Sequence, residues 1–360
     1  MRIICPLAGV GKGLQPFTYS KPKAFLKVAG KRLIDFNLIK LMKSFPKGTK
    51  ICFIIGYKKR QIKEYLSQNY SEYFELEFIE QKPLGYSAEE PFFPGLGDAI
   101  LYAKDFAINE DIFIFLSDRV PLEDYSSLLI NFHQCDCDGI INVKKVEEPQ
   151  HYGVVKLDSN GFLTHIVEKP EIPESNIAVS GAYIIAKSII NHLFELLEIQ
   201  RKKTLENGEV YQITPILDKL IQKGARIKSN EMKEEVLDFG RPESLLKGNR
   251  LLLSEIKNQD PMYEELTKNG MISDTKIIPP VYIGKNVKIN DSIIGPNVSL
   301  GDDLDLEKCI LSESVIGDGV RLNKIISSES IIGDYSILED LIKNRITIGD
   351  ASFITTSNNK

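Results

Sequence analysis

The sequence predicts two structural parts: an α/β domain built on a mainly parallel sheet, and a parallel β-helix near the C-terminal end. Three observations support this. Apolar strand-like runs alternate with amphipathic helix-like runs, glycines follow the first apolar run, and short apolar motifs recur 16 residues apart after about residue 300. A chain of 360 residues is long enough to form one large domain and one smaller domain.

The alternation of strands and helices begins at the N-terminus. Strands are expected at 2–7, 50–56, 76–81 and 111–118, and helices at 33–44, 58–70 and 98–107. This order predicts a Rossmann-like mixed, mainly parallel sheet with helices on both faces. Such sheets bind ligands beyond the carboxyl ends of their strands. We therefore expect the turn after Leu7, the segment after Gln81 and Asp118 to lie at one edge.

The middle of the chain has a different pattern. The expected elements are a hairpin at 152–170 with a Ser-Asn-Gly turn, a strand at 177–186, helical structure to about 223, a strand ending in VLDFG, and a helix from Pro242. The last helix should close the first domain, so the predicted limits are 1–257 for that domain and 258–276 for a linker.

The C-terminal segment, 277–360, carries the repeat. The pairs Leu300-Gly301, Ile316-Gly317, Ile332-Gly333 and Ile348-Gly349 are 16 residues apart, and apolar residues also recur at steps of six within each repeat. Hexapeptide steps are typical of a parallel β-helix of triangular section, here expected to be left-handed. A flat β-sandwich would not explain the repeated interval.

Composition excludes several classes of protein. The net charge of −5 gives no basic excess for nucleic acid, and no apolar run reaches the roughly 18–20 residues of a membrane span. The N-terminus carries no signal-peptide pattern, so a cytoplasmic location is expected. The five cysteines include one lone C-x-C at Cys135 and Cys137 without a second pair, which favours reduced thiols over a zinc site.

The glycine-rich segment after the first strand, residues 6–26, is the first candidate for chemistry. Gly9, Gly11 and Gly13 would let backbone N–H groups approach phosphates closely. The spacing and the prolines that follow do not match a dinucleotide-binding turn, and no G-K-S/T completes a P-loop. A phosphate loop ending in Lys23 and an ordinary surface turn both fit the glycines alone.

This segment resembles the signature of the sugar-1-phosphate nucleotidyltransferase family, which includes glucose-1-phosphate thymidylyltransferases and uridylyltransferases. The family pattern A-G-x-G-T-R-L-x-P-x-T followed by P-K is matched by A-G-V-G-K-G-L-Q-P-F-T and then Pro22-Lys23. Four further markers follow in order: GLGDAI at 95–100, LSD at 116–118, YGVV at 152–155 with VEKP at 167–170, and LDFGRPESLLKGN at 237–249. The hexapeptide tail also occurs in long members of the family.

The resemblance implies a reaction and a set of roles. A nucleoside triphosphate, UTP or dTTP, would react with a sugar 1-phosphate, with glucose 1-phosphate as the default sugar and Mg²⁺ as the cofactor. Asp118 and Asp238 would hold the metal. The other implied residues are Lys12, Lys23 and Lys169 for phosphates, Leu7, Ala8, Gly9, Gly11, Gln81 and Gly95 for the nucleotide, and Gly153, Glu168 and Lys169 for the sugar. Two polyanions must meet in this reaction, so cations and positioning would carry most of the catalysis.

The chain departs from the family pattern at the phosphate loop and beside the first aspartate. Lys12 and Gly13 replace the T-R pair, so the arginine that clamps the triphosphate is missing. Arg119, directly after Asp118, could supply the missing cation or could pair with Asp118 instead. About ten extra residues, 85–94, interrupt the expected base-binding segment and leave the base undetermined.

Three other functions compete with transfer activity. A protein that binds sugar nucleotides and regulates without catalysis would fit the Gly13 and Arg119 departures. An acetyltransferase would use a histidine base in the β-helix, but none of the four histidines lies in the tail. An NAD-dependent oxidoreductase has only the glycines in its favour. The tail is expected instead to serve assembly or regulation, and a homo-oligomer is expected.

Overall fold

The computed structural model describes residues 1–87, 90–207, 210–256 and 260–356. The chain forms two compact units that interleave along the sequence. Unit 1 consists of Met1–Val10 and Phe36–Leu237, and unit 2 of Gly11–Asp35 and Asp238–Lys360. Each unit has its own buried apolar core. Residues 11–35 and 238–256 therefore belong to the same unit as the C-terminal strands, although the sequence predicted them to lie in the first domain, 1–257.

The central sheet of unit 1 is mainly parallel around β1, as the alternation predicted. Its path runs β12-β11-β13-β8-β1-β4-β5, and β10 pairs with β13 and β14. Strand β1 is parallel to β4 and β8, whereas β13 is antiparallel to β8 and β10. The strands are β1 Arg2–Leu7, β4 Lys50–Ile55, β5 Glu75–Glu80, β8 Ile112–Phe115, β10 Gly139–Lys145, β11 Gly153–Leu157, β12 Leu163–Glu168, β13 Ile177–Ile185 and β14 Ile227–Glu231.

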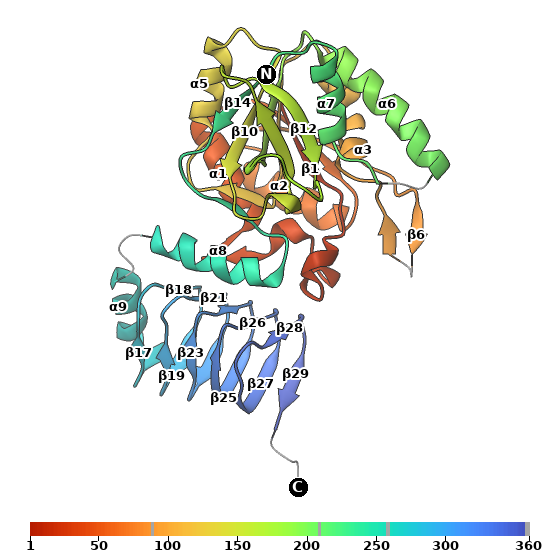
Figure 1. Cartoon of the computed structure of the whole chain (residues 1–360). Coiled ribbons are helices and arrows are strands. Elements are labelled where there is room, and N and C mark those ends of the chain that lie inside the picture. The colour runs from red at the N-terminus through yellow and green to blue at the C-terminus, as the bar shows by residue number, and fades with distance from the viewer. Residues whose placement is uncertain (88–89, 208–209, 257–259, 357–360) are drawn as a thin grey trace. The chain divides into compact units, whose positions relative to one another are not determined.

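Helices cover this sheet on both faces. Figure 1 shows α5 on one side of the strands and α6 and α7 on the other. The helices are α1 Leu33–Ser44, which begins in unit 2, α2 Lys59–Tyr70, α3 Leu96–Leu101, α4 Lys104–Ala107, α5 Ser126–Gln134, α6 Ile190–Asn207 and α7 Thr214–Gln222. Small two-stranded sheets pair β6 Gly85–Ser87 with β7 Glu90–Phe92, and β9 Arg119–Pro121 with β15 Val236–Asp238. Buried Ile, Leu, Val and Phe side chains between sheet and helices form the core that holds the strand ends in place.

Most predicted elements of unit 1 are confirmed, with two differences. The predicted helix at 98–107 is divided into α3 and α4, because the chain leaves helical geometry at Ala103. The predicted strand at 111–118 ends at Phe115, because the chain turns after Leu116. Part of the extra segment, 88–89, lies outside the described residues, and the flanking residues form the β6–β7 hairpin.

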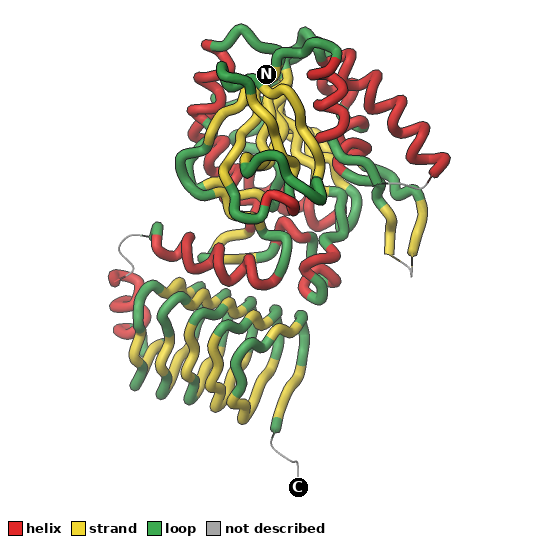
Figure 2. Tube along the Cα trace, viewed as in Figure 1, coloured by secondary structure: helices red, strands yellow, loops and turns green. Residues whose placement is uncertain are grey.

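The C-terminal strands of unit 2 stack in parallel coils, which fits the left-handed parallel β-helix predicted from the sequence (Figure 2). The strands are β16 Ile272–Ser273, β17 Lys276–Ile277, β18 Val281–Ile283, β19 Lys288–Asn290, β20 Ile293–Ile294, β21 Val298–Leu300, β22 Asp305–Glu307, β23 Ile310–Ser312, β24 Val315–Ile316, β25 Arg321–Ser328, β26 Ile331–Ile332, β27 Ile337–Ile342, β28 Thr347–Ile348 and β29 Phe353–Thr355. The stack begins at β16, before residue 277. The last residues of the predicted segment, 357–360, and residues 258–259 of the predicted linker lie outside the described part of the chain.

The repeat interval is not constant along the β-helix. Ile277 pairs with Ile294 across 17 residues, whereas Ile316 pairs with Ile332 across 16.

A glycine occupies the same corner of successive coils because the next coil approaches closely. A Cβ atom on Gly301 would lie 2.5 Å from the carboxylate of Asp318. Gly and Asp therefore recur together at this corner.

The rest of unit 2 consists of short elements that precede the β-helix or come from the N-terminal part of the chain. These are the 3-10 turns η1 Lys12–Leu14, η2 Phe17–Tyr19 and η3 Lys23–Phe25, the hairpin β2 Lys27–Val28 with β3 Lys31–Arg32, and helices α8 Pro242–Ser254 and α9 Asp260–Lys268. Across the described residues of both units, no helix combines the length and the apolar character needed to span a membrane.

Candidate active site

Asp118 lies in a tight turn directly after β8. The N–H of Arg119 donates to the carbonyl of Leu116 at 3.1 Å, which closes the turn. Asn37 of α1 supports the turn, because its side-chain amide donates to the carbonyl of Ser117 at 3.4 Å. Tyr125 in turn donates its hydroxyl to the Asn37 side chain at 2.5 Å. The half-buried Asp118 is thus fixed at the carboxyl end of a parallel strand, where the sequence placed it.

Charged side chains from two segments of unit 1, Asp118-Arg119 and Glu168, act electrostatically on the buried hydroxyl of Tyr183. Burial raises the pKa of Tyr183, the carboxylates of Glu168 and Asp118 raise it further, and the guanidinium of Arg119 opposes them. Arg119 also stacks over the ring of Tyr152, with its guanidinium carbon 4.9 Å from the ring centre. Arg119 therefore lies beside the segment predicted to bind the sugar.

The predicted sugar-binding residues lie at the open end of the β11–β12 hairpin. Gly153 is directly opposite Glu168 in the strand register. Thr214, the first residue of α7, donates its hydroxyl to Glu168 Oε2 at 2.8 Å. The N–H of the next residue, Lys169, donates to the carbonyl of Tyr152 at 2.9 Å, and Lys169 adopts a left-handed backbone conformation with φ 45°. The exposed Lys169 leaves the hairpin at this bend.

The two predicted base contacts are built into the interior of unit 1. Gln81 is 1% exposed, and its amide nitrogen donates to the buried carboxylate of Asp98 at 2.7 Å. Gly95 precedes α3, and a Cβ atom there would lie within 2.4 Å of the carbonyl of Tyr211. The structure gives both residues packing or bonding roles that the sequence did not reveal. Their contact with a base stays a prediction.

The phosphate loop begins in unit 1 and continues in unit 2. Leu7, the last residue of β1, and Ala8 are buried, and Gly9 is exposed with open space where a side chain would lie. In unit 2, Gly11 lies against Lys23, since a Cβ atom on Gly11 would be 2.9 Å from the Cβ atom of Lys23. Lys12 is exposed at the start of η1. Within unit 2 the loop thus folds back so that its glycine and its lysine meet.

Gly13, the position where the family pattern carries an arginine, lies against the segment that contains Asp238. A Cβ atom on Gly13 would be 2.5 Å from the carbonyl oxygen of Gly240. An L side chain at position 13 would require one of the two backbones to move. Restoring arginine at this position would therefore also require a backbone shift and would not simply rebuild the clamp.

The two units thus assemble two groups of predicted residues. Unit 1 brings together Asp118, Arg119 and the sugar-side hairpin, and unit 2 brings together Lys23, Gly13 and the segment that follows Asp238. Thr214 and Tyr183 were missed by the sequence, because nothing in Q-I-T-P or G-A-Y-I-I marks them as partners of Glu168. Thr214 reaches Glu168 from helix α7, and Tyr183 reaches Glu168 and Asp118 from β13, so their roles depend on segments that are distant in the sequence.

The donor set fits the implied magnesium ion. Mg²⁺ usually takes one or two carboxylates and completes its shell with water and substrate phosphates. Asp118 is half-buried in the turn between β8 and β9 of unit 1, and Asp238 is half-buried at the end of β15, where unit 2 resumes. The described residues contain no group of three or more His, Cys, Asp or Glu side chains that could form a metal cage by itself. Either aspartate, taken within its own unit, would thus need water and phosphate oxygens to complete the shell of a bound Mg²⁺.

Comparison with known proteins identifies the class. The family model for nucleotidyl transferases matches residues 7–255, which include the phosphate loop, both aspartates and the hairpin. This chain belongs to the nucleotidyl transferase family.

Individual relatives refine this similarity. The chain is 30% identical over 268 residues to the low-salt glycan biosynthesis nucleotidyltransferase Agl11 of Haloferax volcanii, covering 74% of this chain and 68% of that protein. It is 30% identical over 254 residues to the bifunctional protein GlmU of Methanocaldococcus jannaschii, covering 71% of this chain but only 54% of the relative. The chain therefore spans about half the length of the GlmU relative.

A solved structure supports the fold. The crystal structure of a UDP-glucose pyrophosphorylase complexed with UDP-glucose aligns with a TM-score of 0.58 and 24% identity, covering 71% of this chain and 99% of that chain. This level of similarity shows a shared fold for the matched part.

Proposed function

We propose that this protein is a sugar-1-phosphate nucleotidyltransferase that uses UTP or dTTP and, as the default sugar, glucose 1-phosphate. The observation that carries the proposal is the family match over residues 7–255, since it includes every segment to which the sequence assigned chemistry. A relative named glucose-1-phosphate thymidylyltransferase, from Streptomyces griseus, supports the sugar and the pyrimidine base at 24% identity over 327 residues.

The proposed reaction is a displacement at phosphorus. A phosphate oxygen of the sugar 1-phosphate forms a bond to the α-phosphorus of the triphosphate, and the bond from that phosphorus to the bridging oxygen of pyrophosphate breaks. No proton has to be removed from the attacking phosphate oxygen, because it is already ionised. The protein must bring two anions together and hold them in line.

The chain's own residues divide this work between the two substrates. Lys12 and Lys23 would bind the triphosphate, and the backbone of Leu7, Ala8, Gly9 and Gly11 would surround the nucleotide. Lys169 would bind the sugar phosphate, and Glu168, held by Thr214, would accept hydrogen bonds from sugar hydroxyls while Gly153 offers its backbone. Gln81 and Gly95 would contact the base. Arg119, beside Tyr152, would add a cation on the sugar side.

A magnesium ion held by Asp118 and Asp238 would supply charge neutralisation at the phosphates. We also propose that the protein acts in the cytoplasm as a homo-oligomer.

A pyrophosphate-release assay tests the proposal. UTP, dTTP, CTP and ATP would each be combined with glucose 1-phosphate and other hexose 1-phosphates, with and without Mg²⁺. We expect the highest kcat/KM with UTP or dTTP and turnover that requires the metal. Absence of turnover in every combination would refute the proposed activity.

Substitution of the two aspartates tests the assigned chemistry. Asp118→Ala and Asp238→Ala should each lower kcat by about 100-fold or more, since the phosphate charge would no longer be neutralised. The matched control is Asp136→Ala, which removes a carboxylate that is 99% exposed and pairs with Arg226. Near-wild-type activity of either site variant would show that the metal assignment is wrong.

A further inference from the structure

Four aspartates form a ladder along one corner of the β-helix. The backbone N–H of each member donates to the carboxylate of the next, at 2.9 Å from Asp302 to Asp318, 3.0 Å from Asp318 to Asp334 and 2.8 Å from Asp334 to Asp350. One carboxylate oxygen of the last three aspartates is thus engaged in joining successive coils. The second oxygen of each aspartate can accept another donor.

Two lysines from the N-terminal part of unit 2 bind these second oxygens. Lys27 Nζ lies 2.7 Å from Asp318 Oδ2 and 3.4 Å from Asp302 Oδ2. Lys21 forms ion pairs with Asp334 and with Asp350, the latter at 3.0 Å. Each lysine therefore bridges two adjacent coils, and together they engage all four aspartates.

These lysines lie on either side of Lys23, the predicted triphosphate ligand. Ser20 also donates a hydrogen bond to Asp350, and Pro16 lies next to the same corner, 3.0 Å from where a Cβ atom on Gly349 would lie. Residues 16–27 are therefore attached to the aspartate ladder at several points. The segment itself contains only short 3-10 turns and the start of β2.

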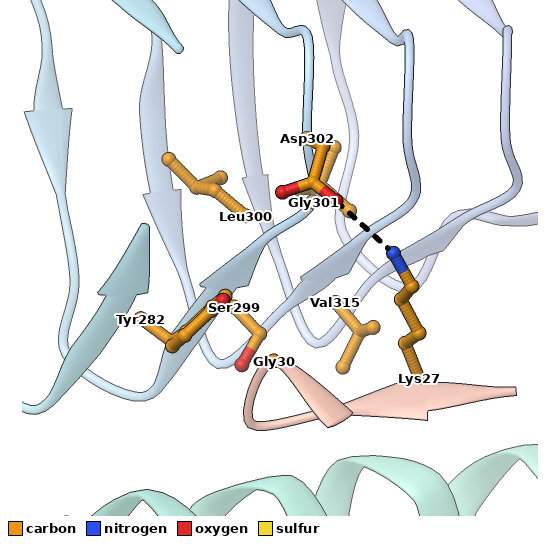
Figure 3. A pocket seen from close by; sticks show the side chains of 9 residues that line it. Lys27, Gly30, Tyr282, Ser299, Leu300, Gly301, Asp302 and Val315 are labelled. Atoms are coloured by element: carbon orange, nitrogen blue, oxygen red, sulfur yellow. Dashed lines mark hydrogen bonds and ion pairs between the residues drawn. The ribbon is translucent and has the colours of Figure 1, made fainter. Parts of the chain in front are cut away.

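The β2–β3 hairpin, which begins at Lys27, packs against the same β-helix. Figure 3 shows Lys27 reaching from this hairpin toward Asp302, with Gly30 at the hairpin turn near Tyr282 and Ser299. The space between them is about 20 Å³, which is room for a single water. Buried Asn249 accepts from the N–H of Ala29 at 2.9 Å and from Ser299 at 2.6 Å, and so joins hairpin, α8 and coil.

We propose that the aspartate ladder positions the phosphate loop for triphosphate binding, so that the β-helix serves the transfer reaction directly. This inference rests on the proposed function for the role of Lys23. Lys21, Lys27 and the four aspartates are positioning residues in it, because they hold the segment that carries Lys23 and need not touch the substrate.

The physical reason is the cost of ordering a loop. Fixing the residues of a flexible segment costs conformational entropy, and a segment without a strand ladder has few backbone hydrogen bonds to offset that cost. Attachment to a rigid stack of coils supplies the order before the substrate arrives. The aspartates also neutralise the two outer lysines, so the loop can carry three closely spaced cations without their full mutual repulsion.

The pKa shifts of the paired groups agree with this arrangement. Burial alone would lower the pKa of Lys27, but the hydrogen bond and the charge of Asp318 outweigh it and raise the pKa above the usual value. Burial would likewise raise the pKa of Asp302, but the N–H of Lys285 and the charge of Lys27 hold it below the usual value. Both groups are therefore charged around neutral pH.

Amide hydrogen exchange on the full-length protein tests the attachment without relying on activity. The double variant Asp318→Asn, Asp334→Asn keeps a side-chain oxygen for the N–H bonds between coils and removes the charge that binds Lys27 and Lys21. We expect the amides of residues 12–28 to exchange at least fivefold faster. The control Glu329→Gln removes a carboxylate that pairs with Arg345 at 2.7 Å within the β-helix, and should leave these amides unchanged.

Substitution on the loop side protects the test against a misfolded β-helix. Lys27→Met should reproduce the faster exchange, whereas Lys27→Arg should retain most of the protection because its guanidinium can still pair with the aspartates. The matched control Lys324→Met breaks an ion pair with Asp340 on the β-helix itself. Equal exchange rates in Lys27→Met, the double variant and the wild type would overturn the proposed attachment.

Steady-state kinetics then test the link to the reaction. In Lys27→Met and the double variant, KM for the triphosphate should rise about tenfold, while kcat and KM for the sugar 1-phosphate change less than about twofold. Faster exchange with an unchanged KM for the triphosphate would refute the positioning role. If the wild type itself transfers nothing, the proposed function fails, and the exchange experiment still decides whether the ladder holds the loop.

Discussion

The sugar-side hairpin and the phosphate loop are stabilised in different ways. The hairpin, β11 with β12, pairs residue by residue with itself and also joins β13, so its end is fixed by strand hydrogen bonds within unit 1. The part of the phosphate loop that lies in unit 2, residues 11–26, has three 3-10 turns and depends on side chains of the β-helix. A hairpin provides its own support, whereas an irregular loop needs external anchors to be ordered.

The largest change in the free energy of unfolding is expected from a side chain added at Gly13, where the phosphate loop packs closely against the chain after Asp238. Gly13→Ala should lower the free energy of unfolding by about 1–3 kcal/mol, because the new Cβ atom would press on the carbonyl of Gly240. Chemical denaturation of the purified protein measures this change. If the loop were loosely held, the loss would be absent.

Gly9→Ala is the matched control for that experiment. Among the described residues, apart from its chain neighbours, nothing lies within 4 Å of a Cβ atom at Gly9, so the free energy of unfolding of this variant should stay within about 0.5 kcal/mol of the wild type. Equal stability of the two variants would mean that the close approach at Gly13 is not a feature of the folded protein.

A smaller effect is expected on the hairpin side. Thr214→Val keeps the shape of the side chain and removes the hydroxyl that donates to Glu168. A hydrogen bond to a charged group contributes about 1.5–3 kcal/mol, and water would restore part of this contribution in the variant. Because Glu168 would be held less firmly for the sugar, KM for the sugar 1-phosphate should rise about three- to tenfold. Initial-rate kinetics with the triphosphate held constant provide the measurement.

Thr164→Val separates this effect from a general weakening of the hairpin. Thr164 also lies on β12 and donates to a backbone carbonyl, that of Lys156, at 3.2 Å. Its loss should leave both KM values unchanged. A rise of the sugar KM in both variants would show that the hairpin, too, needs its side-chain contacts, and the contrast with the phosphate loop would fail.

The smallest effect is a pH dependence of the loop attachment. Because the pKa of Asp302 is lowered in the folded state, its pairing stabilises the protein above the unfolded value of about 3.9 and is lost as pH falls through the lower folded value. Because the pKa of Lys27 is raised, its contribution is present below about 10.4 and is lost as pH rises above that. The difference in melting temperature between wild type and Lys27→Met should be constant from pH 6 to pH 9 and should shrink below about pH 4. A difference that varies between pH 6 and pH 9 would contradict these assignments.

The sequence predicted the elements that are set by local pattern and missed the contacts that are set by distant segments. Helix α1 has the predicted limits, 33–44, because apolar spacing and the preceding turn are both local signals. The coil repeat was visible because each coil repeats the same corner residues. The break between α3 and α4 was missed because the helical apolar pattern continues through it.

The candidate site was predictable as a set of residues and not as an arrangement. Asp118, Glu168 and Lys23 were found from their motifs, but the packing of Gly13 against Gly240 joins residues more than 200 apart in sequence. The pairing of Lys27 with Asp318 is equally non-local. Each aspartate of the ladder could be seen as part of a repeat, yet nothing in a single sequence shows which cation it binds.

The spacing of the ladder also limits how the protein's tail could change in length. Neighbouring strands lie about 4.8 Å apart, so the pair of coils used by Lys27 and the pair used by Lys21 are separated by a fixed rise. Inserting one coil between Asp318 and Asp334 would carry the second pair of carboxylates out of reach of Lys21, while a coil added after Asp350 would leave both lysines in place. The two lysines therefore fix the number of coils between the first and the last aspartate of the ladder.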